Sequence, residues 1–180
     1  MTAALATGCM PQTRLSGTAP AAEVEYSRPL TRVLVIVERV GPTDRKTIED
    51  DLVASLRAKG VDAHPWSELF AAPPTDRDAT RAALVANRYD GALVVSLEDV
   101  VEEQCGDLGG CMHDRSGFMT LERYVTMDSR LWDVRGGDAI VWKGRTETMN
   151  PTDRKDLARN VSSTIVPELA RVKLVVAASS

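Results

Sequence analysis

The chain has few of the residues from which catalytic sites are most often built. It holds two histidines, His64 and His113, and neither lies in a recognisable serine or cysteine nucleophile motif. It also lacks a Gly-x-Gly-x-x-Gly or Walker sequence, so no nucleotide cofactor is predicted. We therefore expect a protein that is not an enzyme and that carries no cofactor.

Long apolar runs and an excess of one charge are also missing. No run approaches the roughly 18 apolar residues of a membrane-spanning helix, so we expect any membrane attachment to depend on a lipid. The 26 acidic and 22 basic residues are interspersed and give a net charge of -4. This balance provides no electrostatic reason to expect nucleic acid as a partner.

The first of only three cysteines is Cys9. The run Leu5-Ala6-Thr7-Gly8-Cys9 resembles the end of a bacterial lipoprotein signal peptide, in which small residues precede a lipid-acceptor cysteine. The resemblance implies that Cys9 carries the lipid, palmitate included, and that the mature chain begins there. Met10 in place of Asp implies an outer membrane lipoprotein that faces the periplasm. The alternative is an ordinary free thiol in the N-terminal segment.

The sequence predicts three parts along the chain. Residues 1–8 lack the basic and apolar regions of a complete signal peptide, so we interpret them as a truncated remnant. Residues 9–30 are rich in Pro, Thr, Ser and Ala without apolar periodicity, which is typical of a flexible tether. Residues 31–178 have the size of a single domain able to bury its own core.

The other two cysteines, Cys105 and Cys111, are separated by a loop containing three glycines. An even number of cysteines in an exported protein favours a disulfide, which would close this loop. Free thiols are one alternative. A metal site that adds His113 and either Asp107 or Asp114 is another, although the spacing matches no common zinc pattern.

Apolar periodicity predicts an α/β (α+β) domain with packing helices on a single mixed sheet of about five strands. The expected order is βαβαβββα and ends with an antiparallel hairpin and a helix. The predicted strands are 32–37, 61–66, 92–103, 121–133 and 139–148. The predicted helices are 43–60, with Thr43 as N-cap, 75–87, and one that begins at Asn150-Pro151 and is kinked or ended by Pro167.

This layout resembles the periplasmic α/β domains of the TolB amino-terminal domain, CsgG and LpoB. The resemblance rests on residues 45–60, Tyr89-Asp90-Gly91, Leu131-Trp132-Asp133 and the stretch from Trp142-Lys143-Gly144 to Asn150-Pro151. Small uncharacterised Gram-negative lipoproteins share the pattern. These motifs look structural, so the resemblance implies a fold and a compartment, and no functional residue is carried over.

The leading hypothesis is a non-catalytic envelope lipoprotein that binds a periplasmic protein or a cell-wall component. We expect the contact surface at an exposed edge of the 121–148 hairpin and at the cysteine loop. One alternative is a metal or small-ligand carrier that uses Cys105, Cys111 and His113. A second alternative is a hydrolase built on the acidic region, in which Asp99, Glu102 and Glu103 lie near Asp107 and Asp114.

Overall fold

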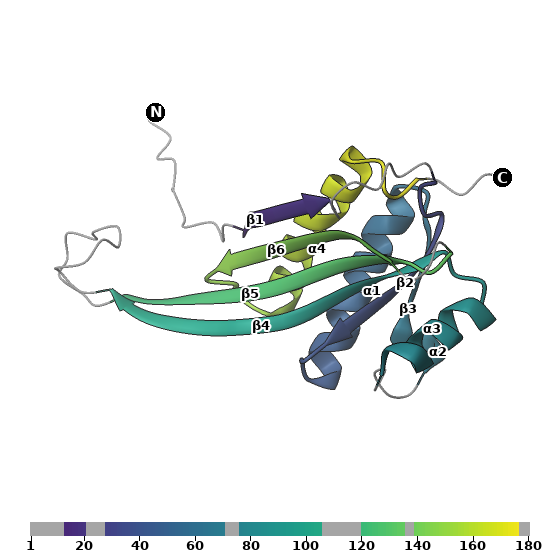
Figure 1. The fold of residues 1–180 in the computed structure, drawn as a ribbon. Coiled ribbons are helices and arrows are strands. Elements are labelled where there is room, and N and C mark those ends of the chain that lie inside the picture. Colours follow the sequence, from purple (N-terminus) through teal and green to yellow (C-terminus); the bar gives the residue numbers. More distant parts are fainter. Residues whose placement is uncertain (1–12, 21–27, 71–75, 106–119, 136–138, 177–180) are drawn as a thin grey trace, which may run out of the picture.

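The computed structural model describes residues 13–20, 28–70, 76–105, 120–135 and 139–176 (Figure 1). These residues form one mixed sheet with the strand order β1-β6-β5-β4-β2-β3. The strands are β1 (Thr13–Pro20), β2 (Arg32–Glu38), β3 (Asp62–Pro65), β4 (Gly91–Cys105), β5 (Thr120–Asp133) and β6 (Ala139–Met149). The helices are α1 (Pro42–Ala58), α2 (Trp66–Leu69), α3 (Arg77–Ala86) and α4 (Arg154–Arg171). No described helix is both long and apolar enough to cross a membrane.

Strand β2 is an inner strand, as its continuous apolar sequence predicts. It pairs in parallel with β3 on one side and β4 on the other, and Val33 to Val37 are all buried. Helices α1 and α4 pack on one face of the sheet, where they bury the larger core. The largest side chains of that core include Leu30, Ile48, Leu52, Leu56, Leu93, Met127, Leu131, Trp142 and Ile165.

The opposite face of the sheet is covered only in part. A second apolar cluster gathers Leu34, Ile36, Trp66, Leu84, Tyr89, Ala92, Val94 and Val134 over β2 and β4. The outer face of β5 and β6 also carries charged side chains. Asp128 and Arg145 pair there at 2.7 Å, from the carboxylate oxygen to Nε. The antiparallel half of the sheet thus has one core face and one solvated face.

The prediction of about five strands is wrong, because β1 adds a sixth. It lies within residues 9–30, for which we expected a tether, and it pairs antiparallel with β6. The hydroxyls of Thr13 and Thr148 lie 3.0 Å apart across this pair. The polar sequence of β1 has no strand periodicity, and its backbone is held by the edge that β6 offers.

The predicted hairpin of β5 and β6 is present, but its edges are occupied. Strand β5 pairs with β4 and β6 pairs with β1. The expectation of an exposed hairpin edge is therefore wrong, since backbone groups on both outer sides already have partners. The order of elements differs as well, because the short helix α2 follows β3 and precedes α3.

Three helices begin at other residues than predicted, and α3 starts at Arg77, two residues after the predicted Thr75. Helix α1 starts at Pro42, and its N-cap is Gly41 in place of the predicted Thr43. Helix α4 starts at Arg154, and the side chain of Asp153 accepts a hydrogen bond from the backbone N–H of Asp156. This cap replaces the predicted one at Asn150. Pro167 does not end the helix, which continues to Arg171.

The sheet has two different ends. At the basal end, which we define by Leu30–Arg32 where β2 begins, the helices α1, α3 and α4 finish. The backbone there bonds to residues that follow each helix: Asp62 N–H donates to Thr31, Asp90 N–H to Arg32 and Leu30 N–H to Leu174. At the hairpin end, which we define as β4 beyond Ser96 with its β5 partners, β4 no longer has β2 beside it. Figure 1 shows this pair of strands extending past the helices.

Candidate binding pocket and hairpin end

The sequence-predicted cysteine site cannot be built from the described residues. Cys9, Cys111 and His113 lie outside them, and Cys105 is the last residue of β4, where only its backbone is described. Among the residues that the structure describes, no group of three or more His, Cys, Asp and Glu side chains is placed to hold a metal ion. The lipid, disulfide and metal interpretations therefore stay predictions.

The acidic region predicted for a hydrolase is spread out. In the strand register Glu102 lies opposite Arg123 and Glu103 lies opposite Glu122. Neighbouring residues of a strand point to opposite faces, so the two glutamates do not face one another. Asp99, Glu102 and Glu103 are all exposed.

His64 has a structural environment. Its Nε2 lies 2.8 Å from the carboxylate of Asp62, and its ring packs edge-on against Tyr89 with 5.9 Å between ring centres. Glu49 is also structural. Its buried carboxylate accepts hydrogen bonds from the backbone N–H groups of Val37 (3.3 Å) and Ser67 (3.1 Å), while burial raises its pKa. It ties α1 to the end of β2 and the start of α2.

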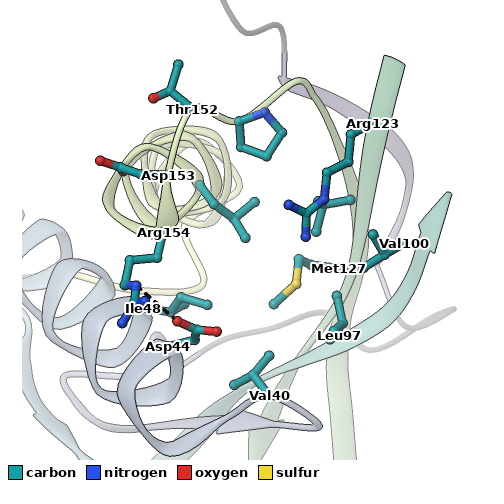
Figure 2. Close-up of a pocket in the computed structure, with 13 residues that line it drawn as sticks. Val40, Asp44, Ile48, Leu97, Val100, Arg123, Met127, Thr152, Asp153 and Arg154 are labelled. Carbon is teal, nitrogen blue, oxygen red and sulfur yellow. Dashed lines mark ion pairs between the residues drawn. The ribbon is translucent and has the colours of Figure 1, made fainter. Parts of the chain in front are cut away.

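A pocket opens at the hairpin end, between the first turns of α1 and α4 and the inner face of β4 and β5 (Figure 2). Its volume is about 260 Å³. The apolar walls come from Val40, Ile48, Leu97, Val100, Val125, Met127, Pro151 and Leu157. The polar lining comes from Asp44, Arg123, Thr152, Asp153 and Arg154.

Most charges of the pocket rim already have partners. Asp44 pairs with Nε of Arg154 at 3.3 Å, which links the first turns of α1 and α4. Asp153 accepts the N–H of Asp156 at 2.8 Å as the cap of α4. The guanidinium of Arg123 forms no ion pair with any described residue. In Figure 2 it points into the pocket.

The backbone of Arg123 is fixed by Asn150. Arg123 N–H donates to the side-chain oxygen of Asn150, and Asn150 N–H donates to the Arg123 carbonyl, both at 2.7 Å. Asn150 has φ of 49°, a left-handed conformation that asparagine adopts more readily than most residues. Sequence reasoning assigned Asn150 to a helix cap and gave Arg123 no role, because the cross-strand contact joins residues 27 positions apart.

The outer face of the hairpin end is acidic. The hydroxyl of Tyr124 donates to Glu122 at 2.5 Å. This hydrogen bond and the negative charges of Glu122, Glu103 and Glu147 raise the pKa of Tyr124 to about 12. Val101, on this face, is 38% accessible, whereas Leu121, on the same face as Arg123, is 59% accessible.

The two ends differ in the sign of most of their unpaired charges, although the unpaired guanidinium of Arg123 lies at the hairpin end. At the hairpin end the carboxylates without an ion pair to a described residue are Asp99, Glu102, Glu103 and Glu122, and Glu147 lies beside this end on β6, opposite Thr126. At the basal end the cations without one are Arg57, Lys59, Arg88 and Lys173, which lie in the last turn of α1 or just after α1, α3 and α4. Helix C-termini favour such cations, which explains their positions. From Gly91 to Glu103 at about 3.3 Å per residue, the ends are roughly 40 Å apart.

Comparison with known proteins shows the fold and no family. No protein-family model matches the chain, and no curated protein matches it. A dodecamer of a PelC variant from Paraburkholderia phytofirmans matches with a TM-score of 0.50 and 20% identity, over 91% of this chain and 99% of that one. A second PelC dodecamer from the same organism matches with a TM-score of 0.51 and 16% identity, over 88% and 97%.

Lipoprotein GNA1162 from Neisseria meningitidis is a more distant match, with a TM-score of 0.46 and 16% identity over 77% of this chain and 97% of that one. The PelC matches show that the chain has the PelC fold over nearly its whole length. The narrower resemblance to the TolB amino-terminal domain, CsgG and LpoB stays a prediction.

Proposed function

We propose that this chain is a non-catalytic accessory lipoprotein of the bacterial cell envelope that works as an assembly of identical copies. Cys9 carries the lipid, and the domain lies in the periplasm at the outer membrane. The fold match to PelC, whose solved form is a dodecamer, supports this proposal. The observation that carries it is the separation of unpaired charge between the two ends of the domain.

The two ends are complementary to one another and cannot meet within one copy. The acidic hairpin end, with exposed Val101 and Leu121, matches the basal end with Lys59, Arg88 and Lys173 of a second copy. A contact between two different surfaces of identical chains is heterologous, and it produces a ring when the rotation between copies closes. Charge complementarity also steers the approach of the copies.

Size-exclusion chromatography with light scattering of the full chain carrying Cys9→Ser tests the assembly without the lipid. We expect the mass of several copies in about 50 mM salt and a lower mass in about 500 mM salt, because salt screens exposed charges. Glu103→Lys combined with Glu122→Lys should reduce the mass at low salt. The control, Glu68→Lys with Asp78→Lys, makes the same change of net charge outside both ends and should leave the assembly intact.

A Cys9→Ser chain without further substitutions that is monomeric at every salt concentration would contradict the assembly. The anchor is tested separately by the intact mass of the protein from the envelope fraction, expressed from its full upstream reading frame. We expect a triacylated chain that begins at Cys9, and loss of this species in Cys9→Ser. An unlipidated, soluble wild-type protein would contradict the envelope assignment.

A further inference from the structure

The pocket at the hairpin end combines an apolar interior with a cation that has no described ion-pair partner. Ile48, Met127 and Leu157 are among its apolar walls, and Arg123 lies at its side. A guanidinium without a counter-ion beside apolar surface offers its donors to a ligand. The other charged groups of the rim are committed to the pair of Asp44 with Arg154 and to the cap of α4.

We propose that this pocket binds a small carboxylic acid with a short aliphatic chain. The carboxylate pairs with the guanidinium of Arg123, and the aliphatic chain lies against Leu97, Met127 and Leu157. All of these residues belong to one copy of the chain, so binding does not require the proposed assembly.

The charge of the rim selects a monoanion. The planar guanidinium fork matches a carboxylate with two parallel hydrogen bonds. A doubly charged phosphate would place its second charge near the carboxylates of Asp44 and Asp153, with only one uncommitted arginine to balance it. A cationic ligand would be repelled by Arg123.

The size of the pocket selects a short chain. Its volume of about 260 Å³ is below the roughly 300–1,000 Å³ that is usual for pockets that enclose drug-sized ligands. Hexanoate is therefore a suitable probe. Acetate carries the same charge without the apolar chain, while hexanol and hexylamine carry the chain without the negative charge.

Glu102 is the natural competitor of the ligand. It lies opposite Arg123 in the strand register, and register partners point to the same face of the sheet. The two side chains nevertheless form no ion pair among the described contacts. Removing the charge of Glu102 should therefore strengthen binding of an anion.

Methyl NMR of the full chain, titrated with hexanoate, tests the site. We expect saturable shifts of the methyl groups of Met127 and Leu157, at least tenfold weaker affinity for acetate, hexanol and hexylamine, and none for inorganic phosphate. Shifts that do not saturate, or hexanol binding as tightly as hexanoate, would overturn the proposal.

Matched variants test whether Arg123 binds the carboxylate. Because Arg123 is exposed, its replacement should leave the core intact. Arg123→Gln should weaken hexanoate binding at least tenfold, and Arg123→Lys should weaken it less. Arg81→Gln, at an exposed arginine on α3, is the control and should bind as the wild type does. Glu102→Gln should bind about two- to threefold more tightly, since a nearby like charge is removed. Unchanged affinity in Arg123→Gln would overturn the proposal.

Discussion

The carboxylates of the basal end and of the hairpin end differ in how many partners they have. At the basal end the carboxylate of Asp90 accepts three hydrogen bonds, from Thr31 N–H, the Thr31 hydroxyl and Arg32 N–H, at 2.7 to 3.0 Å. Arg135 adds an ion pair at 3.8 Å. At the hairpin end the guanidinium of Arg123 and the carboxylates of Glu102 and Glu122 form no ion pair with a described residue, although Glu122 accepts a hydrogen bond from Tyr124.

This difference separates groups that stabilise the fold from groups that can contact other molecules. Satisfied polar groups and close packing at the basal end join β2, β4 and β5 into one unit. Unpaired charges and exposed apolar side chains at the hairpin end contribute little to folding, so they remain available to other molecules.

Gly91→Ala, at the basal end, should cause the largest loss of stability. A Cβ at Gly91 would lie 1.9 Å from the Trp132 carbonyl oxygen and 2.4 Å from a methyl carbon of Leu30. The strand backbone at Trp132 would have to shift to relieve this clash. We therefore expect a loss of about 3 kcal/mol or more in the free energy of unfolding, measured by urea denaturation.

The control for this substitution is Gly41→Ala. A Cβ at Gly41 has no atom within 4 Å, so the cost should stay below about 1 kcal/mol, mainly from the helix N-cap. Equal destabilisation by the two substitutions would contradict the close packing of the basal end.

Asp90→Ala should have the next largest effect. It removes the acceptor of three hydrogen bonds and leaves Thr31 and Arg32 without their partner, which should cost about 2–3 kcal/mol. Burial opposes ionisation of Asp90, but the hydrogen bonds from Thr31 and Arg32 and the charge of Arg135 outweigh it and lower its pKa.

The effect of Asp90→Ala should depend on pH in a defined direction. A lowered folded-state pKa stabilises the protein above the unfolded pKa of about 4, and this stabilisation is lost as pH falls through the folded value. The difference in unfolding free energy between wild type and Asp90→Ala should therefore be constant from about pH 6 to 7 and shrink below about pH 4. A difference that grows on acidification would show that folding raises the pKa of Asp90 and would contradict this prediction.

Glu122→Gln tests the acidic environment of Tyr124 at the hairpin end. The pKa of Tyr124, about 12 in the native protein, should fall toward its ordinary value near 10, because the substitution removes a charged acceptor and a nearby negative charge. Ultraviolet titration of the tyrosinate absorbance measures it. Glu98→Gln is the control, since Glu98 pairs with Arg39 and is not among the charges that raise the Tyr124 pKa.

Leu121→Ser should have the smallest effect on stability. The side chain is 59% exposed, so the free energy of unfolding should change by less than about 0.5 kcal/mol. If Leu121 contributes to the assembly, the same substitution should lower the mass measured by light scattering. A loss of several kcal/mol would show that the hairpin end is part of the core.

The sequence predicts the elements whose periodicity reports burial. The apolar runs of β2 and of β4 up to Leu97, and the alternation of β5, are confirmed at nearly the predicted residues. Strand β1 could not be predicted in the same way, because its sequence is polar and its order comes from pairing with β6. Local sequence also placed the start of α4 too early, at Asn150-Pro151 instead of Arg154.

The candidate pocket could not be predicted from the sequence. Arg123 lies in an alternating strand and Asn150 precedes a proline, and both patterns have ordinary structural interpretations. Their contact depends on β5 and β6 being neighbours, while Asp44 and Arg154 meet only because α1 and α4 share one face of the sheet.

By itself, the sequence determined a mixed α/β domain with buried central strands, since burial leaves a local apolar pattern that any window of the chain reveals. Only the tertiary structure decided which polar groups are satisfied. Asp90 precedes β4 and Arg123 lies within β5, and both are charged, yet the chain folds donors around one and leaves the other facing a pocket. That outcome depends on residues far apart in the chain, which no local pattern records.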